Sequence, residues 1–360
     1  MFKTTDDQTY YLRTGTKKFD AIFNYLKNKN FNSLLDVGCN NAICSYKIQK
    51  ELNKDVVGID FSDDLKLPDD YNFIKEDVSN SCAVREADVI LFLSLYHHML
   101  GCYGLDKADD IFFKLLLNCN ELIFDTGNLS EIGYSDTPWY KVLAKHFNNE
   151  KDLLDHFRVP YKKITSWSSS SGLGERNVVV FKKEDFDKSV KVKNIFQRRN
   201  CGFGSSGTHY PLEPVDHLKQ DDEFKKFLQK TPFSTAGRDG SIFDGALYFK
   251  LEIGGKTFFS KKRIKKPAAL DIEKKEIANI KRVYNLAEKD QVFLNPLKSQ
   301  LINFYGFSET YGLIFEWLEN FKYTESTNIR IDSQYGEIIE LNDVDGIIHN
   351  GKYKILDFER

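Results

Sequence analysis

A short apolar run that stops at a glycine is the feature that most constrains how this sequence can fold. Residues 33–38 read Ser-Leu-Leu-Asp-Val-Gly, small and polar residues come next, and helix-compatible residues then continue to Leu52. Such a run is typical of a buried parallel strand, and small residues after it let the chain turn sharply into a helix. A second run of this kind follows at residues 55–60. The pattern predicts a strand–helix–strand unit.

The rest of the first half repeats this alternation. An amphipathic stretch at residues 19–26 precedes the first run, and further strand-like runs lie at residues 71–78, 87–94, 122–125 and 178–181. Strands that alternate with helices favour a parallel sheet covered by helices on both faces. We therefore expect an α/β fold that begins with a Rossmann-like, doubly wound domain.

A change in composition separates the two halves of the chain. Residues 182–199 are rich in lysine and polar side chains, and a glycine-rich segment follows at 201–207. Residues 202–207 match GxGxxG by letter, but no predicted strand precedes them and no helix clearly follows, which favours a linker. We predict a first domain at residues 1–185, a connector at 186–230 and a second domain at 231–360.

The second half has the pattern of a smaller α+β domain. Residues 246–253 and 256–262 are strand-like and flank a Gly254-Gly255 turn, which predicts a hairpin. A charged helix is expected at residues 270–286, with strands near 301–305 and 312–316. A last turn, Asn350-Gly351, is predicted to join residues 346–349 to 352–358.

Composition excludes several classes of protein. The 51 lysines and arginines against 53 acidic residues give a formal net charge of −2, which excludes a chain that is basic throughout. The six cysteines form no CxxC pair, so neither a disulfide scaffold nor a zinc cluster is expected. The N-terminus is polar, and no apolar run approaches the ~18 residues of a membrane helix. We therefore predict a cytoplasmic protein without a membrane span.

Two acidic residues at strand ends indicate a nucleotide-like ligand. Asp36 precedes the turn at Gly38, and Asp60 ends the next strand 24 residues later. This spacing is close to the roughly 20 residues at which a carboxylate holds ribose hydroxyls. The turn has one glycine and lacks the GxGxxG of a pyrophosphate site, so a ligand without phosphate there, such as S-adenosylmethionine, fits best. Another nucleotide, or no ligand, is the alternative, and Asp77 is expected near the adenine amino group.

These motifs resemble those of class I S-adenosylmethionine-dependent methyltransferases. The resemblance covers about residues 10–183 and rests on residues 35–39, 57–60 and 76–78. It implies that the Asp36–Gly38 turn lies against the methionine part of the cofactor and that Asp60 holds the ribose. The cofactor-binding residues expected on this basis are Asp36, Gly38, Cys39, Asn40, Asp60, Phe61, Asp77, Val78 and Ser94.

Two histidines directly follow the predicted fourth strand. Ligands of open α/β sheets bind beyond the carboxyl ends of the strands, so His97 and His98 are expected to face the methyl donor. An imidazole there acts as a general base or donates a hydrogen bond to an acceptor oxygen. The alternative is that one histidine caps the next helix and the other packs in the core. No third ligand lies at metal spacing, so no metal site is expected in this domain.

Residues 93–99, with Tyr103-Gly104, resemble the methyltransferase half of bacterial O-antigen chain-terminating methyltransferase–kinases. RNA gamma-phosphate-capping methyltransferases carry a related pattern, and their domain ends in a strand similar to residues 176–181. Both relatives methylate a phosphate oxygen, for which positioning and positive charge matter more than a base. Residues 10–13 resemble a lead-in segment of these families, in which Arg13 either pairs with the cofactor's carboxylate or is a solvated arginine.

The second half resembles a protein-kinase-like fold. Lys261, Glu276, Asp343 and Asp357 follow each other in the order of that fold and of the methyltransferase–kinases. The resemblance implies a buried lysine paired with Glu276, and ATP and Mg²⁺ bound near the two aspartates. However, Asn342-Asp343 replaces the usual His-x-Asp, and the chain stops three residues after Asp357. We expect an incomplete module that binds a nucleotide or a protein partner, with an unrelated α+β domain as the alternative.

The predicted activity is O-methylation of a saccharide or phosphosaccharide of a surface polysaccharide. This acceptor follows from the resemblance alone. An RNA-end or other nucleic-acid methyltransferase is one alternative, which requires a basic face beside the His97 pocket. A non-catalytic scaffold that binds a nucleotide or a partner is the other.

Overall fold

The computed structural model describes most of the first half of the chain and separate segments of the second. The described backbone covers residues 8–79, 85–168, 174–198, 212–214, 246–263, 274–283, 302–318, 322–332, 338–349 and 352–355. Side chains are described for residues 17–79, 85–131, 133–168, 174–194, 248–262, 274–283 and 302–318. The chain forms two compact units, unit 1 (Met1–Ser189) and unit 2 (Val190–Arg360).

Unit 1 is built on a seven-stranded sheet with the order β3-β2-β1-β4-β5-β7-β6. Strands β1 to β5 pair in parallel, whereas β7 runs antiparallel to β5 and to β6. The strands are β1 (Ser33–Val37), β2 (Asp55–Asp60), β3 (Asn72–Lys75), β4 (Ala87–Leu93), β5 (Cys119–Asp125), β6 (Tyr161–Ser168) and β7 (Glu175–Lys182). The strand order reverses between β1 and β4, which confirms the predicted doubly wound fold.

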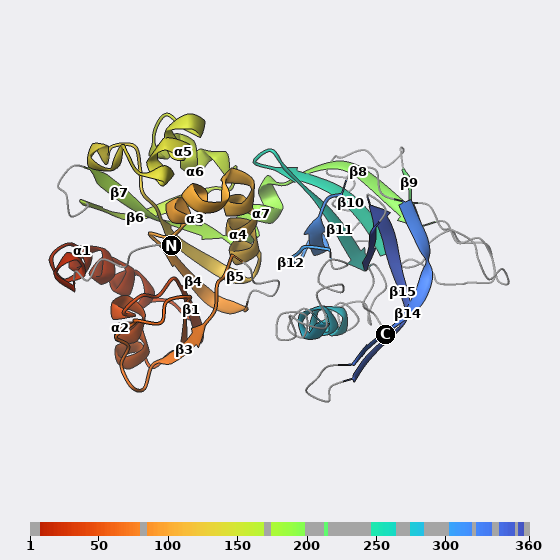
Figure 1. Ribbon diagram of the computed structural model, residues 1–360, viewed down its shortest axis with the longest axis horizontal. Coiled ribbons are helices and arrows are strands. Elements are labelled where there is room, and N and C mark those ends of the chain that lie inside the picture. Colours follow the sequence, from red (N-terminus) through yellow and green to blue (C-terminus); the bar gives the residue numbers. More distant parts are fainter. Residues whose placement is uncertain are drawn as a thin grey trace. The chain divides into compact units, whose positions relative to one another are not determined.

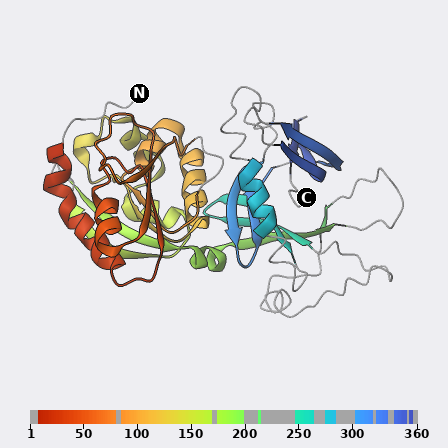
Figure 2. The same cartoon turned by 90° about the horizontal axis from the view of Figure 1, so that it is seen from below.

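Helices cover both faces of this sheet. Helices α1 and α2 lie on one side and α3 and α4 on the other (Figures 1 and 2). The helices are α1 (Gln8–Leu26), α2 (Ile43–Leu52), α3 (Tyr96–Tyr103), α4 (Leu105–Leu117), α5 (Pro138–His146), α6 (Glu150–His156) and α7 (Lys183–Ser189), with the 3-10 turn η1 (Ile132–Tyr134). Two apolar faces of the sheet are thereby buried, as a parallel sheet requires.

Aromatic side chains form a large part of the core against β5. Phe112 of α4 stacks on Phe157 with ring centroids 3.6 Å apart and an interplanar angle of 9°. Phe124 of β5 and Phe181 of β7 pack edge-on against Phe112, and all four rings are fully buried. Burying one such ring contributes roughly 1.5–3 kcal/mol. This packing fixes the carboxyl end of β5, where the polar site begins.

Unit 1 differs from the prediction at several elements, among them helices α5, α6 and α7, for which no helix was predicted. Strand β3 is four residues long rather than the predicted 71–78, so Asp77 lies beyond it in a turn. Strand β6 was not predicted, because its polar residues leave most of it only partly buried at the sheet edge. Helix α1 begins at Gln8, eleven residues before the predicted amphipathic stretch.

Unit 2 contains a six-stranded sheet with the order β12-β13-β11-β10-β8-β9. The predicted hairpin is confirmed by β10 and β11, which pair antiparallel around Gly254-Gly255. A helix over residues 274–283 lies within the predicted 270–286, whose ends are outside the described residues. The strands are β8 (Lys191–Arg198), β9 (Leu212–Pro214), β10 (Ala246–Ile253), β11 (Lys256–Arg263), β12 (Phe304–Ser308) and β13 (Gly312–Glu316).

Two strands lie where the sequence predicts a connector. Strand β8 belongs to the predicted connector at 186–230, yet it pairs with β10 and with β9 in the sheet of unit 2. A strand therefore does precede the GxGxxG letters of residues 202–207, contrary to the prediction, while those residues themselves lie outside the described ones. Alternating apolar residues in the lysine-rich stretch, such as Val192, carry the strand pattern that composition hides.

A separate three-stranded antiparallel sheet follows β13. Its strands are β14 (Lys322–Asp332), β15 (Ile338–His349) and β16 (Lys352–Ile355), in the order β14-β15-β16. The pairing of His349 with Lys352 agrees with the turn predicted at Asn350-Gly351, although the turn residues lie outside the described ones. Asp343 is a residue of β15.

Candidate cofactor and acceptor site

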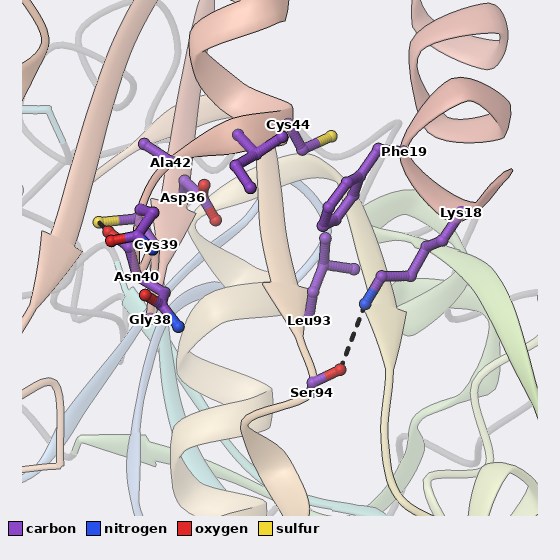
Figure 3. Close-up of a pocket in the computed structure, with 12 residues that line it drawn as sticks. Lys18, Phe19, Asp36, Gly38, Cys39, Asn40, Ala42, Cys44, Leu93 and Ser94 are labelled. Carbon is purple, nitrogen blue, oxygen red and sulfur yellow. Dashed lines mark hydrogen bonds between the residues drawn. The ribbon is translucent and has the colours of Figure 1, made fainter. Parts of the chain in front are cut away.

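A pocket opens at the carboxyl ends of β1 and β4, where the strand order of unit 1 reverses. Crevices at such a switch point are the usual ligand sites of open α/β sheets. Figure 3 shows the residues around it, which come from α1, β1, the turn after β1, α2 and the end of β4. They are Lys18, Phe19, Asp36, Gly38, Cys39, Asn40, Asn41, Ala42, Ile43, Cys44, Leu93 and Ser94.

The backbone N–H groups of the turn after β1 donate hydrogen bonds within the protein. The Gly38 and Cys39 N–H groups both donate to the Ile59 carbonyl, at 2.8 and 3.1 Å. The Asn40 N–H donates to the Asp60 carboxylate at 3.1 Å, and the Ala42 N–H to the Cys39 carbonyl at 2.8 Å. A phosphate cradle needs such N–H groups directed at the ligand. The turn is therefore poorly suited to a pyrophosphate.

Gly38 allows the turn to pass close to its neighbours. Its φ is +73°, and a Cβ atom there would lie 2.7 Å from Leu95 Cδ2. Asn40 and Ala42 also have positive φ, at 48° and 53°. Three positive-φ residues in five compress the turn, so that Asp36 and the start of α2 line one pocket.

Asp36 presents a buried carboxyl to the pocket. It is 6% exposed and accepts a hydrogen bond from the Ser45 hydroxyl at 2.5 Å, while Ser45 also contacts the Tyr71 hydroxyl at 2.8 Å. Burial raises the pKa of Asp36 to about 6, with a further rise from Asp60 that the Ser45 hydrogen bond opposes. A cationic group of a ligand would favour its charged form.

Asp60 lies behind the turn rather than in the pocket lining. Its carboxylate accepts from the Asn40 N–H and, at 3.0 Å, from the Ser62 N–H. It thus fixes the turn while retaining lone pairs for a ligand hydroxyl. The next residue, Phe61, is 52% exposed, an uncommon position for a large apolar side chain.

The remaining predicted cofactor residues are placed as follows. Cys39, Asn40 and Ser94 line the pocket with Asp36 and Gly38, whereas Asp60, Phe61, Asp77 and Val78 do not. Asp77 accepts from the N–H and the hydroxyl of Ser79, at 2.9 and 2.6 Å, so it shapes its own turn. Arg13 lies on α1, but its side chain is outside the described ones.

A buried ion network that the sequence did not reveal borders the pocket. Lys18 of α1 contacts Asp125 at 3.2 Å and the Ser94 hydroxyl at 3.3 Å. Asp125 is fully buried and also accepts from the Ser94 N–H at 2.6 Å and from Trp167 Nε1 at 2.9 Å. Burial alone would raise its pKa, but Lys18, Arg176 and these hydrogen bonds bring the pKa below its usual value.

Arg176 extends the network on the other side of Ser94. It makes two 2.8 Å bonds to the Glu131 carboxylate and a 3.2 Å bond to the Ser94 hydroxyl. Arg176 is 4% exposed and Glu131 is fully buried. Each cation of the network is thus matched by a carboxylate, which a buried charge requires.

The two histidines occupy different hydrogen-bonding environments. His97 is 3% exposed, and its Nδ1 accepts from the Gly127 N–H at 2.8 Å and contacts the Thr126 hydroxyl at 3.2 Å. An accepting Nδ1 places the proton of the neutral ring on Nε2. Burial, followed by nearby positive charge, lowers the pKa of His97 well below its ordinary value. His97 is therefore a neutral donor through Nε2.

His98 is less buried and packs against His97 in a tilted arrangement, with ring centroids 4.2 Å apart and an interplanar angle of 39°. Burial, and then Arg176, lowers its pKa to about 4. It is therefore neutral at physiological pH. Neither histidine lines the pocket itself; both follow its edge at Leu93 and Ser94.

Unit 2 contains the predicted lysine–glutamate pair. Lys261 of β11 donates to Glu276 of the 274–283 helix at 2.9 Å, and both side chains are buried. A lysine on a strand paired with a glutamate on the following helix is the arrangement found at the nucleotide site of protein kinases. Asp343 lies in β15 and not in a loop, its side chain is not described, and Asp357 is outside the described residues.

Sequence reasoning missed Lys18, Asp125 and Trp167, and noted Arg176 only as part of a strand. A signal existed for Asp125, which ends a predicted strand next to the one that carries Ser94. For Lys18 none existed, since its partner Asp125 is 107 residues away.

Among the described residues, no group of three or more His, Cys, Asp or Glu side chains is arranged to hold a metal, and no helix could cross a membrane.

Comparison with known proteins finds similarity at the level of structure. No protein-family model and no curated protein matches the sequence. A structure of the bifunctional kinase-methyltransferase WbdD is 15% identical, with 85% of this chain and 62% of that chain covered and a TM-score of 0.39. The plantazolicin methyltransferase BpumL, in complex with a pentazolic desmethylPZN analog and SAH, is 19% identical, with 48% and 84% covered and a TM-score of 0.34.

The chain spans 62% of the length of that WbdD chain and 48% of a second WbdD structure, which is 16% identical with a TM-score of 0.38. The sequence motifs described above resemble the same two classes of protein, methyltransferase–kinases and S-adenosylmethionine-dependent methyltransferases.

Proposed function

We propose that unit 1 is an S-adenosylmethionine-dependent O-methyltransferase. The observation that carries this proposal is the turn after β1, which directs the Asp36 carboxyl toward the pocket and uses its own N–H groups internally. A pocket lined by the Asp36 carboxyl, with Asp60 behind the turn and no phosphate cradle, suits a cationic ligand with ribose hydroxyls. When bound, S-adenosylmethionine supplies an electrophilic methyl group on a positively charged sulfur.

Different residues of the site would bind different parts of the cofactor. Asp36 and the Gly38 turn would hold the methionine part, and Asp60 would accept hydrogen bonds from the ribose hydroxyls. Burial raises the pKa of Asp36 to about 6, so the ionised carboxyl lacks full compensation, and a positively charged ligand beside it would favour this form. Phe61, exposed beside Asp60, would provide an apolar surface for the adenine.

The two histidines would act on the acceptor in different ways. His97 Nε2 donates a hydrogen bond and positions the acceptor, because its Nδ1 is held by the Gly127 N–H. His98 is the general base for a hydroxyl acceptor, since it is neutral above about pH 4. For a phosphate acceptor, which is already an anion, the base would contribute little.

Replacing His98 distinguishes these acceptors. With a saccharide hydroxyl, His98→Ala is expected to slow methyl transfer by roughly 10²–10⁴-fold at unchanged cofactor affinity. With a phosphate oxygen, the loss is expected to stay within about tenfold. Single-turnover rates with each isolated acceptor class, and calorimetry for the cofactor, measure both quantities.

Cofactor binding is the first test of the proposal. Titration calorimetry with S-adenosylmethionine should show binding to the wild type and on the order of 10–100-fold weaker binding to Asp60→Ala, because hydrogen bonds to a charged group are lost. Asp63→Asn is the matched control, since Asp63 is a nearby surface acid that pairs with Lys75. No binding to the wild type at millimolar cofactor would refute a methyltransferase.

The acceptor class is the second test. We propose a saccharide or phosphosaccharide of a surface polymer, supported by the resemblance of residues 93–99 and Tyr103-Gly104 to methyltransferase–kinases. A labelled methyl group should pass from the cofactor to the polysaccharide fraction of a lysate. Label in the RNA fraction, together with RNA binding that weakens as the salt concentration rises, would identify a nucleic-acid methyltransferase instead.

For unit 2 we propose nucleotide binding, on the basis of the buried Lys261–Glu276 pair. ATP with magnesium should raise the unfolding temperature of this unit in the wild type and not in Asp357→Ala. A shift in neither protein would leave unit 2 as a structural or partner-binding module. An equal shift in both would show that a nucleotide binds without Asp357.

A further inference from the structure

We propose that Lys18 binds the α-carboxylate of the cofactor's methionine part. The proposal rests on the proposed function, because it assigns a contact within the same pocket. It names a residue of α1 that belongs to none of the sequence motifs and lies outside the turn after β1.

Lys18 is a buried cation at the wall of the pocket. Its side chain is 4% exposed, although lysine is almost never buried without a specific partner. In Figure 3 it enters from α1, on the opposite side of the view from Asp36 of β1. The pocket is thus bordered by a cation from one element and a carboxyl from another.

The ammonium of Lys18 has hydrogen-bonding capacity beyond its protein partners. It has three N–H donors, and the structure gives it two oxygen partners, Asp125 at 3.2 Å and Ser94 at 3.3 Å. Its Nζ also lies 4.5 Å from the centroid of the Trp167 ring, a contact that occupies no oxygen acceptor. Both distances to oxygen exceed the 2.7–2.9 Å typical of charged pairs. Asp125 meanwhile receives shorter bonds, from the Ser94 N–H and Trp167. Lys18 is therefore anchored and still able to donate to a ligand.

The charges on the pocket match an amino acid zwitterion. The methionine part of S-adenosylmethionine carries an α-ammonium and an α-carboxylate, and Asp36 and Lys18 are their complements. A nucleoside that lacks the amino acid part, such as 5′-methylthioadenosine, uses neither. The contribution of Lys18 can therefore be measured as the difference between its effects on the binding of a ligand that has the amino acid part and of one that lacks it.

The test compares S-adenosylhomocysteine with 5′-methylthioadenosine by titration calorimetry of the full chain. Lys18→Met should weaken S-adenosylhomocysteine binding on the order of 10–100-fold and change 5′-methylthioadenosine binding by less than about twofold. Lys18→Arg should restore part of the lost affinity, because the positive charge returns. Lys17→Met, at the exposed neighbour on the same helix, should bind both ligands as the wild type does.

Loss of the Lys18 charge leaves Asp125 buried without its cation, which can unfold the protein. The double variant Lys18→Met with Asp125→Asn removes both charges, and the same selective loss is expected in it. An equal loss for both ligands would make Lys18 a structural residue, and no loss for either would show that it does not contact the carboxylate. If the wild type binds neither ligand, the proposed function fails, and not this assignment alone.

Hydrogen exchange supplies a second readout, independent of activity. A carboxylate bound by Lys18 would tie α1 to the end of β4, so S-adenosylhomocysteine should slow exchange of amides in residues 17–26 and 5′-methylthioadenosine should not. Equal protection by both ligands would overturn the assignment.

Discussion

The buried carboxyl of Asp36 makes opposite contributions to folding and to cofactor binding. Its pKa in the folded protein is about 6, above the ordinary value of 3.8, so the folded state binds this proton more tightly than the unfolded chain does. Its contribution therefore favours folding below pH 3.8 and is lost as the pH rises through 6. At pH 8 the folded protein carries a buried charge that the Ser45 hydrogen bond and Lys18 stabilise in part, and that a cationic ligand would stabilise further.

Asp36→Asn is accordingly expected to stabilise the protein without ligand and to weaken the cofactor complex. At pH 8 the free energy of unfolding should rise on the order of 2 kcal/mol, and at pH 5 the gain should shrink, because the wild-type carboxyl is then mostly neutral. Urea unfolding at both pH values, with calorimetry for the cofactor, measures the two effects. A destabilised variant at pH 8 would contradict this account of Asp36.

Single residues of the site were predictable where strand ends expose them in the sequence. Asp36 lies near the end of a recognisable strand run, Gly38 and Ser94 directly follow such runs, and all three line the pocket. Lys18 and Arg176 were not predictable as site residues, because their partners lie 107 and 45 residues away. Only the folded sheet brings such residues together.

At the scale of elements, the turn between β1 and α2 depends on its glycine. Gly38→Ala places a Cβ at positive φ and within 2.7 Å of Leu95. The variant is expected to lose roughly 1–2 kcal/mol of stability for the backbone, more for crowding, and about tenfold in cofactor affinity. Gly104→Ala is the matched control, because Gly104 has φ +82° and no atom lies within 4 Å of the position that its Cβ would take.

Thermal unfolding and cofactor calorimetry separate the two contributions. Gly104→Ala should show the backbone cost alone, with cofactor affinity as in the wild type. Equal effects of both variants on affinity would mean that the turn after β1 has no special role in binding.

The link between β11 and the 274–283 helix depends on one buried ion pair. Lys261→Met leaves Glu276 charged in the core and is expected to cost about 3–5 kcal/mol. The double variant Lys261→Met with Glu276→Met should recover most of this loss, because no unpaired charge remains. Lys262→Met, at the next and less buried residue, should cost below about 1 kcal/mol.

Hydrogen exchange of β11 and of residues 274–283 measures these losses directly. If the double variant is no more stable than Lys261→Met, the cost comes from packing and not from the unpaired carboxylate.

The elements that could be predicted are those with a regular pattern of apolar residues. The hairpin β10–β11 and strand β13 have the predicted positions, because a glycine marks one end of each of these alternating or continuous apolar runs. Strands β6 and β8 were hidden by their lysines, since an edge or sparsely buried strand keeps polar side chains on its open side.

At the scale of the whole molecule, the chain is two compact units, each with its own sheet. A composition change predicted that there would be two parts, and pairing of β8 with β10 assigns residues 191–198 of the lysine-rich stretch to the second. Composition gives only the average polarity of a stretch. Whether the stretch forms a strand of the sheet depends on whether every second residue is apolar and can face the core. Units with separate cores are expected to respond separately to ligands and mutations.

Ligand-induced protection should therefore be confined to one unit at a time. S-adenosylhomocysteine at 100 times its dissociation constant should stabilise unit 1 by about 2.7 kcal/mol, seen as slower exchange in β1, β4 and β5. Exchange in β10, β11 and β13 should not change. Lys261→Met should give the reverse pattern, with faster exchange in those three strands alone. Slower exchange of β11 on addition of S-adenosylhomocysteine would show instead that the two units are energetically coupled.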